Sequence, residues 1–286
     1  MIKIVSWNVN GIRSNIICEG SMKKNKKILK ELPNECNLKN LIDEHKPDII
    51  CFQETKCSEA IGKQFQFNEY PFKYWNESKG DGRRGSGYSG TSIWSKIEPE
   101  FIDNKYINDS IIFKNEEGRF LIAKFKTFDL INVYVPNSGT NYEYRISEWD
   151  KNIHSILEEY KNNEKLLIYT GDLNVVSNKL DIWNPTILES KDMNPKTHNG
   201  LLKDERDNFN KFINELEYID VFRHLHKDKV EYSWWDQRTK CRPINKGRRI
   251  DYFLILNKYI EFVNNSNVIT DIMGSDHCPI SIELKF

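Results

Sequence analysis

The sequence predicts an α/β sandwich, built as one domain over residues 1–286. Short apolar and β-branched runs stop abruptly at Gly, Pro, Asn or Gln, as is typical of strands in a buried sheet. Stretches with helical spacing of apolar residues lie between some of these runs. The sequence contains no internal repeat and no Pro/Gly/Ser-rich linker, so a single layered α/β domain accounts for the pattern best.

The expected strands share one feature, a polar residue directly after the apolar run. They are Ile2–Val5 before Trp7-Asn8, Asp48–Phe52 before Gln53-Glu54, Ile131–Val135 before Pro136-Asn137, Leu166–Thr170 before Gly171-Asp172, Arg249–Leu256, and Val268–Ile272 before Gly274–His277. Side chains just beyond strand ends leave the core, so we expect these polar groups to converge in one crevice.

Helices are expected over Asn37–Glu44, Tyr144–Tyr160 and Asp207–Leu216, where apolar residues recur at helical spacing. Two polar stretches, near residues 18–36 and 185–204, interrupt the pattern and are expected to be insertions. The first carries lysines 23, 24, 26, 27 and 30. Such a run is more often a solvated helix face than a DNA contact.

Composition narrows the class of protein. The chain has 42 basic and 42 acidic residues, so it is not a whole-surface polyanion binder, although a local basic face is compatible with this balance. The start lacks a secretory pattern, and no apolar run approaches the roughly 20 residues of a membrane helix. The 6 cysteines form no CxxC pair, which indicates free thiols in a reducing compartment. We expect an intracellular protein, nuclear in a eukaryote and cytoplasmic otherwise.

Carboxylates and amides gather after the expected strands, and one histidine joins them. They are Asn8, Glu54, Asp172, Asn174, Asp276 and His277. A single acid of this kind is more often a turn residue or a helix cap, but the regular placement of the whole set favours a site. Oxygen donors without a Cys/His cluster suit a hard cation such as Mg²⁺.

His277 requires a partner that orients its ring. Neighbours on an extended chain point to opposite sides, so Asp276 is poorly placed for this. Asp251, in the run Arg249–Leu256, is the candidate from another strand. Such a pair would fix the tautomer of His277 and favour its charged form, although a structural histidine is the alternative.

Seven segments carry a resemblance to a known family. KIVSWNVNGIRS, PDIICFQETK, GYSGTSIWSK, NVYVPNSG, GDLNVV, GRRIDYF and GSDHCPI resemble the successive motifs of the exonuclease III family of abasic-site (AP) endonucleases. They stand in the family's order from Lys3 to Ile280. GDLN and SDH alone would indicate only the broader endonuclease/exonuclease/phosphatase superfamily. The resemblance implies a DNase I-like fold, a four-layer α/β sandwich of two packed mixed β-sheets flanked by helices.

The resemblance also implies roles for individual residues. Glu54 matches the principal metal ligand, with Asn8, Asn10 and Asp276 beside it; Asn10 stands where some members carry an aspartate. The expected catalytic residues are Tyr134, Asp172, Asn174, Asp251 and His277. Asp172 matches the residue that aligns or deprotonates the attacking water. The expected DNA contacts are Arg13, Tyr88, Asn137, Asn199, Trp234, Arg238, Arg248 and Ile250.

The implied activity is that of a class II AP endonuclease in base excision repair, acting as a monomer on double-stranded DNA with abasic sites. In-line hydrolysis 5′ to the abasic sugar would leave a 3′-hydroxyl and a 5′ deoxyribose phosphate. We also expect some 3′→5′ exonuclease or 3′-end-cleaning activity. Mg²⁺ is the expected cofactor, with Mn²⁺ as a substitute.

Arg238–Arg249 has six basic residues and no acid, just after Trp234-Trp235. We expect this loop to grip phosphates and the tryptophans to press into damaged DNA; a solvated loop over two core tryptophans is the alternative. Arg248 departs from the family, which usually has an aromatic residue there in the wall of the abasic-sugar pocket. Our hypothesis is that Arg248 turns outward to a phosphate and leaves a roomier, less selective pocket walled by Trp234 and Ile250.

Two other functions compete. A phosphatase or diesterase acting on lipid, inositol or RNA would keep Asn8, Glu54, Asp172 and His277, but would have no reason to carry the GYSG, NVYVPNS and RIDYF segments. A binding module that has lost catalysis would not keep a candidate at every catalytic position. Both are therefore less favoured than the DNA phosphodiesterase.

Overall fold

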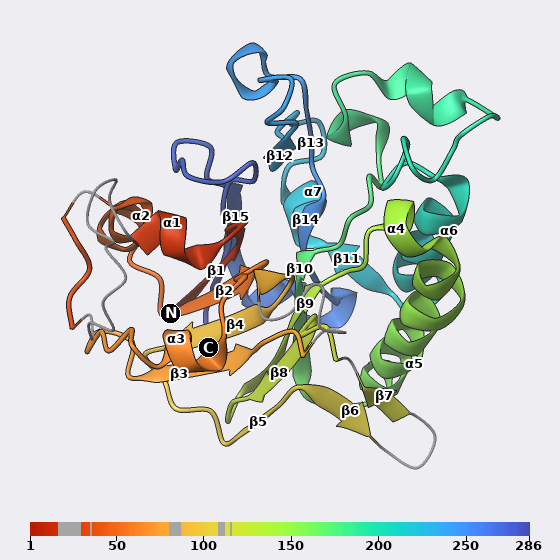
Figure 1. Cartoon of the computed structure of the whole chain (residues 1–286). Coiled ribbons are helices and arrows are strands. Elements are labelled where there is room, and N and C mark those ends of the chain that lie inside the picture. Colours follow the sequence, from red (N-terminus) through yellow and green to blue (C-terminus); the bar gives the residue numbers. More distant parts are fainter. Residues whose placement is uncertain (17–29, 35, 80–86, 108–111, 115) are drawn as a thin grey trace.

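The computed structural model describes residues 1–16, 30–34, 36–79, 87–107, 112–114 and 116–286 (Figure 1). Most of the expected insertion near residues 18–36, including four of its lysines, lies outside the described residues. Among the residues that are described, no helix is long and apolar enough to cross a membrane.

Two six-stranded sheets form the centre of the molecule. The first has the order β15 (Val263–Val268), β16 (Ile280–Leu284), β1 (Ile2–Asn8), β2 (Ile49–Gln53), β4 (Thr91–Ser95) and β3 (Phe72–Asn76). The second has the order β11 (Tyr218–Asp220), β14 (Asp251–Leu256), β10 (Leu166–Asp172), β9 (Phe128–Tyr134), β8 (Phe120–Lys124) and β5 (Phe101–Asp103). Both are mixed, because β1 pairs with β2 and β9 with β10 in parallel, whereas the other neighbours are antiparallel.

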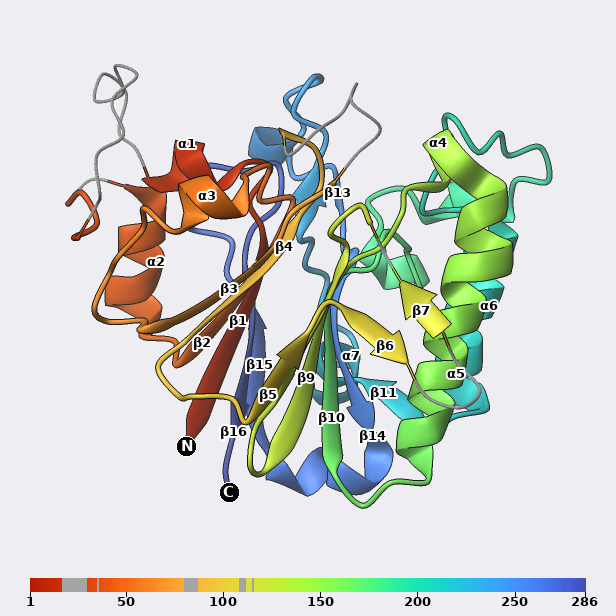
Figure 2. The ribbon, with the colours of Figure 1, turned by 60° about the horizontal axis from the view of Figure 1, so that its bottom comes forward.

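Two short hairpins lie beside the sheets, one from β12 (Trp234–Trp235) and β13 (Gly247–Arg248), the other from β6 (Lys105–Ile107) and β7 (Ile112–Lys114). Helices flank the outer faces (Figure 2). The helices beside the first sheet are α1 (Ile12–Ile16), α2 (Asn37–His45) and α3 (Glu59–Gly62); those beside the second are α4 (Ser138–Glu143), α5 (Asp150–Lys161) and α6 (Lys203–Asn214). α7 (Val221–Leu225) follows β11. The expected four-layer sandwich is confirmed.

Alternation along the strands explains the four layers. Ile4, Leu130 and Ile168 belong to one buried cluster that joins the two sheets. Their neighbours Val5 and Ile131 face outward, Val5 into a cluster with α2 and Ile131 into a cluster with α5 and α6. Successive strand residues point to opposite faces, so a strand covered on both sides is apolar throughout. This is why the strands appear in the sequence as unbroken apolar runs.

Three sequence expectations need correction. Val268–Ile272 is not a strand: β15 ends at Val268 and the following residues form a turn. Asn264, Asn265 and Asn267 stand within β15 and hid it from a search for apolar runs. The helix expected over Asp207–Leu216 begins earlier, at Lys203, because Glu205 accepts hydrogen bonds from the backbone N–H groups of Gly200 and Leu202.

The helix expected over Tyr144–Tyr160 is continuous, but its first part is a π-helix, η2 (Tyr144–Trp149), followed by α5. Short 3₁₀ segments complete the described structure: η3 (Lys179–Asp181), η4 (Pro185–Glu189), η5 (Arg242–Ile244) and η6 (Asn257–Phe262). The last strand, β16, lies antiparallel to β1 with Ile2 opposite Leu284, which brings the two termini together (Figure 2).

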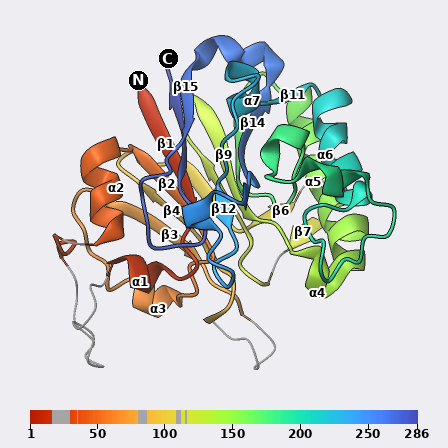
Figure 3. The same cartoon turned by 90° about the horizontal axis from the view of Figure 1, so that it is seen from above.

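The carboxyl ends of β1, β2, β9 and β10 meet at one edge of the sandwich. A buried contact fixes the two sheets there: Gln53 Nε2 donates to Asn132 Oδ1 at 2.7 Å, and Asn132 Nδ2 donates to the carbonyl oxygen of Phe52 at 3.0 Å. Figure 3 looks onto this edge, with β12 near its centre. The polar residues that follow these strands therefore meet at one place.

Candidate active site

Asn8, at the end of β1, connects the two sheets at this edge. Its Nδ2 donates to Glu54 Oε1 at 3.0 Å and to Asp172 Oδ2 at 2.9 Å, and its side chain is fully buried. Glu54 and Asn174, just beyond β2 and β10, both have φ of 48°. Left-handed backbone is unusual outside glycine and clusters at functional sites. Here it turns side chains that follow two different strands toward each other.

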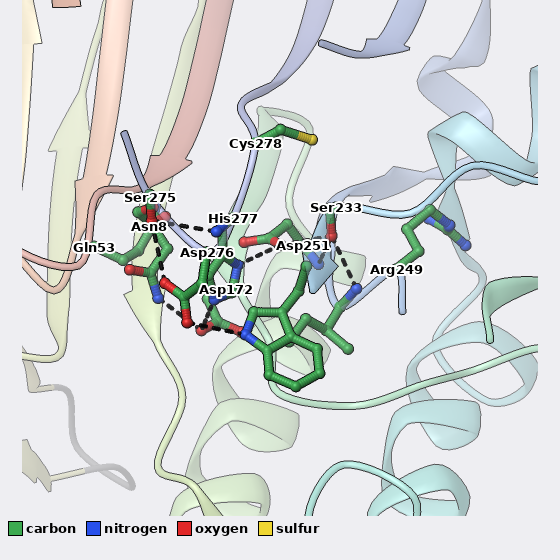
Figure 4. Close-up of polar contacts among 12 residues, drawn as sticks. Asn8, Gln53, Asp172, Ser233, Arg249, Asp251, Ser275, Asp276, His277 and Cys278 are labelled. Carbon is green, nitrogen blue, oxygen red and sulfur yellow. Dashed lines mark hydrogen bonds and ion pairs between the residues drawn. The ribbon is translucent and has the colours of Figure 1, made fainter. Parts of the chain in front are cut away.

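His277 is held by a residue from β14. Its Nδ1 lies 2.8 Å from Asp251 Oδ2, which also accepts a hydrogen bond from Ser233 Oγ at 2.6 Å (Figure 4). The expected pair of Asp251 and His277 is therefore present. Burial lowers the pKa of His277, but the charges of Asp251 and Asp172 outweigh it and raise that pKa to about 10. The imidazole is thus held as a cation.

Asp172 lies on the opposite side of the imidazole. Its Oδ2 is 3.7 Å from His277 Nε2, and its Oδ1 accepts from the backbone N–H of Asn174 at 3.0 Å. Burial raises the pKa of Asp172 above the usual range of an aspartate, although the His277 cation works against this. A buried carboxylate with a raised pKa is suited to accept a proton.

Asp276 points away from the imidazole. Its Oδ1 accepts from Asn10 Nδ2 at 2.9 Å and its Oδ2 from Trp234 Nε1 at 3.1 Å (Figure 4). Burial raises the pKa of Asp276, but the His277 cation and these hydrogen bonds leave it below its usual value. Asp276 is therefore a carboxylate that faces Asn10 and Glu54 across the mouth of the site.

Two basic residues at the site were missed from the sequence. Lys56 Nζ lies 2.8 Å from Glu54 Oε2 and donates to Asn10 Oδ1. Its position two residues after Glu54 was the available signal. The Arg119 guanidinium stacks on the ring of Tyr134 at 4.5 Å and donates to the hydroxyl of Tyr88 at 2.7 Å. Arg119 precedes β8, away from every motif, so nothing in the sequence pointed to it.

A cavity of about 610 Å³ opens beside these groups. Glu54, Tyr134, Asp172, Asn174 and His277 line one part of it. The expected DNA contacts that line the cavity are Asn137, Asn199, Trp234, Arg238, Arg248 and Ile250, joined by Lys196 and Gln237. Arg13 and Tyr88 are not in its lining. A second cavity, of about 660 Å³, lies beside α3 and β3 and contains none of the expected catalytic residues.

The hypothesis that Arg248 turns outward is wrong. Its guanidinium lies 5.3 Å from the ring of Trp234, and Nη1 donates to the carbonyl oxygen of Asn199 at 3.1 Å. Stacking on Trp234 holds it in the cavity wall. The alternative for the tryptophans holds in part, since Trp235 is only 3% exposed and belongs to the core, whereas Trp234 lines the cavity.

The donors at the mouth fit a hard cation. Glu54 and Asp276 supply carboxylate oxygens, Asn8 and Asn10 supply amide oxygens, and the Lys56 ammonium already lies between Glu54 and Asn10. Asp172, Asp251 and His277 also hold ligand atoms within 4.8 Å of one another. We interpret this second group as a hydrogen-bonded chain, because a protonated imidazole offers no lone pair to a metal.

The profile of the Endonuclease/Exonuclease/phosphatase family matches residues 5–277. A protein named exodeoxyribonuclease from Bacillus subtilis is 31% identical over 285 residues, which cover 98% of each chain. The protein named DNA repair nuclease APEX1 from Danio rerio is 32% identical over 289 residues, covering 99% of this chain and 82% of that one. The solved structure of an AP endonuclease from Leishmania major superimposes with a TM-score of 0.77 at 25% identity, over 100% of this chain and 88% of that one.

Fold and site together define a metal-dependent phosphodiesterase of the nuclease type. The chain belongs to the endonuclease/exonuclease/phosphatase family, in its exonuclease III branch of AP endonucleases. The resemblance seen in the motifs is thereby confirmed. The expected free thiols are found at the five described cysteines, Cys36, Cys51, Cys57, Cys241 and Cys278.

Proposed function

We propose that this protein is a class II AP endonuclease of base excision repair, which hydrolyses the DNA backbone 5′ to an abasic site. The observation that supports this most directly is the meeting of Glu54, Asp172, Asn174 and His277 at one cavity with Trp234 in its wall. The names of the relatives, exodeoxyribonuclease and DNA repair nuclease, point to the same substrate class. Incision would leave a 3′-hydroxyl and a 5′ deoxyribose phosphate.

In this proposal the residues of the chain position and stabilise the reacting groups. Asp172, with its raised pKa, aligns the attacking water and accepts its proton. His277, held as a cation by Asp251, stabilises the negative charge that grows on the phosphate oxygens. Asn8, Asn174 and the hydroxyl of Tyr134 add neutral donors at the same place.

Mg²⁺ is the cofactor we propose, with Mn²⁺ as a substitute, and Glu54 is its principal ligand beside Asn8, Asn10 and Asp276. When bound, the ion would neutralise charge on the phosphate and on the departing 3′-oxygen. Tyr134 stays protonated, because burial and the neighbouring Glu54 raise its pKa well above that of a free phenol. It therefore remains a hydrogen-bond donor.

We further propose that residues 1–286 form one catalytic domain that acts as a monomer. DNA would be its macromolecular partner, contacted by Arg13, Tyr88, Asn137 and Asn199 and by the loop Arg238–Arg249. Its place would be with the DNA, in the nucleus of a eukaryote or the cytoplasm of another cell. A lower 3′→5′ exonuclease or 3′-end-cleaning activity would share the site, since both break the same type of bond.

The test is a duplex with one tetrahydrofuran abasic analogue, incubated with Mg²⁺ and then with a chelator. Metal-dependent incision 5′ to the lesion, absent from the undamaged duplex, is the expected result. Tight binding without incision would favour a binding module instead. Hydrolysis of inositol phosphates with no action on DNA would favour a phosphatase.

A further inference from the structure

Arg248 brings a positive charge into the cavity without a carboxylate partner. One of its N–H groups donates to the carbonyl oxygen of Asn199, and its flat face stacks on Trp234. Among the residues that the structure describes, it forms no ion pair. The next residue, Arg249, pairs with both Asp181 and Asp220. The two neighbouring arginines therefore differ in purpose: Arg249 is satisfied by the fold, and Arg248 is not.

A guanidinium in this position favours an anionic ligand. It stays charged and has five N–H donors in a planar fork, of which Asn199 takes only one. Burial lowers the pKa of Arg248, which indicates that water is partly removed from the group. Removing a cation from water is costly unless an anion compensates it. A carboxylate can accept two parallel hydrogen bonds from such a fork.

The position of Arg248 relative to the reacting phosphate decides which anion it would meet. A phosphodiester held by Glu54, Asp172 and His277 has two ester groups. One leaves, and the other stays attached to phosphorus. The wall formed by Trp234, Ile250 and Arg248 belongs to the same cavity, so it can receive the group that stays. Arg248 would then contact an anion on that retained group, a few bonds away from the reacting phosphorus.

We propose that Arg248 selects for DNA 3′ ends blocked by a phosphodiester whose small retained group ends in a carboxylate, as in a 3′-phosphoglycolate. This inference rests on the proposed nuclease function of the same site. The step is a hydrolysis. The water oxygen bonds to phosphorus, the P–O3′ bond breaks with its electron pair on O3′, and a proton from the water reaches O3′. The products are a DNA 3′-hydroxyl and free phosphoglycolate, and nothing is oxidised or reduced.

The experiment compares two 3′-blocked duplexes of matched shape, one ending in phosphoglycolate and the other in its neutral glycolamide. The wild-type protein should show kcat/KM about tenfold higher for the glycolate, equivalent to about 1.4 kcal/mol. Arg248→Gln should bring the ratio close to one, and Arg248→Lys should keep part of the preference. Lys196→Gln removes another cation from the cavity lining and serves as the matched control, so its ratio should stay at the wild-type value.

A wild-type ratio near one would overturn the proposal, as would a ratio that Arg248→Gln leaves unchanged. An equal fall in Lys196→Gln would also overturn it, because it would show a general effect of positive charge. The tetrahydrofuran duplex is a separate arm that tests the proposed function. Should the protein cleave none of these substrates, that function fails. Binding of the two blocked duplexes in the presence of a chelator would then decide the role of Arg248.

Discussion

Asp251 Oδ2 lies 2.8 Å from His277 Nδ1, although Asp276 is next to His277 in the chain. β12 places the segment that carries the histidine: the backbone N–H of Trp235 donates to the carbonyl oxygen of Asp276 at 3.0 Å, and Trp234 forms a β-bridge with His277. The ring is thus set between Asp251 and Asp172, with Nε2 toward the cavity. Two of the predictions below depend on this arrangement.

Asp251→Asn should move the pH dependence of activity. Asp251 raises the pKa of His277, so its loss lowers that pKa. A cationic His277 is present only below its pKa, so activity in alkaline solution should be lost at lower pH than in the wild type. At neutral pH we expect kcat/KM on the abasic duplex to fall about 100-fold.

The measurement is the pH profile of kcat/KM. Ser233→Ala is the control, because it removes a hydrogen bond to Asp251 but keeps the carboxylate beside the ring. Its alkaline limb should stay near that of the wild type. An Asp251→Asn profile that only drops, with its limb in place, would contradict the role given to His277.

Asp172→Asn should give a folded and nearly inactive protein. The amide can still accept from the backbone N–H of Asn174, so the turn after β10 is kept. The variant cannot take a proton from water, and kcat should fall about 10³-fold or more. Thermal unfolding provides the control for folding. Activity within tenfold of the wild type would show that another group serves as the base.

The sequence was sufficient to predict the layers and the centre of the site, for one physical reason. Strands covered on both faces are apolar throughout, and their polar successors, such as Asn8 and Asp172, mark where they leave the core. The same reasoning failed for β15, because Asn264 and Asn265 stand at half-exposed or exposed positions beside β16. An edge strand does not require apolar residues on both faces.

Residues whose position depends on distant packing were beyond prediction. Arg119 reaches Tyr134 only because β8 pairs with β9. Arg248 was expected to turn outward, but stacking on Trp234 across the β12–β13 hairpin holds it in the cavity wall. Local sequence shows the charge of such residues, but not the ring or carbonyl group that fixes their direction.

Glu54→Gln should raise the concentration of Mg²⁺ needed for half-maximal activity by about tenfold or more, because an amide oxygen is a weaker ligand than a carboxylate. The measurement is activity on the abasic duplex over a Mg²⁺ titration after removal of metal with a chelator. Glu59→Gln is the matched control, since Glu59 is exposed and does not line this cavity. An unchanged Mg²⁺ requirement in Glu54→Gln would exclude Glu54 as a principal ligand.

Asp181→Asn should destabilise the fold behind the cavity wall. Asp181 is fully buried and accepts from Arg249 Nε and Nη2, both at 2.8 Å, and from Arg223 Nη2 at 2.6 Å. Loss of its charge leaves the buried Arg249 only partly compensated, by Asp220. We expect the free energy of unfolding to fall by about 3–5 kcal/mol at neutral pH.

This destabilisation should shrink in acid. Burial raises the pKa of Asp181, but the charges of Arg249 and Arg223 outweigh it and hold the pKa below its usual value. The stability that Asp181 contributes is therefore complete above the pKa of an unfolded aspartate, about 3.9, and is lost as the pH falls through the lower folded value. Denaturant unfolding at pH 7 and near pH 3 measures both quantities, with the exposed Asp192→Asn as control. A difference between wild type and Asp181→Asn that stays constant over this range would show that the ion pairs with Arg249 and Arg223 are not its source.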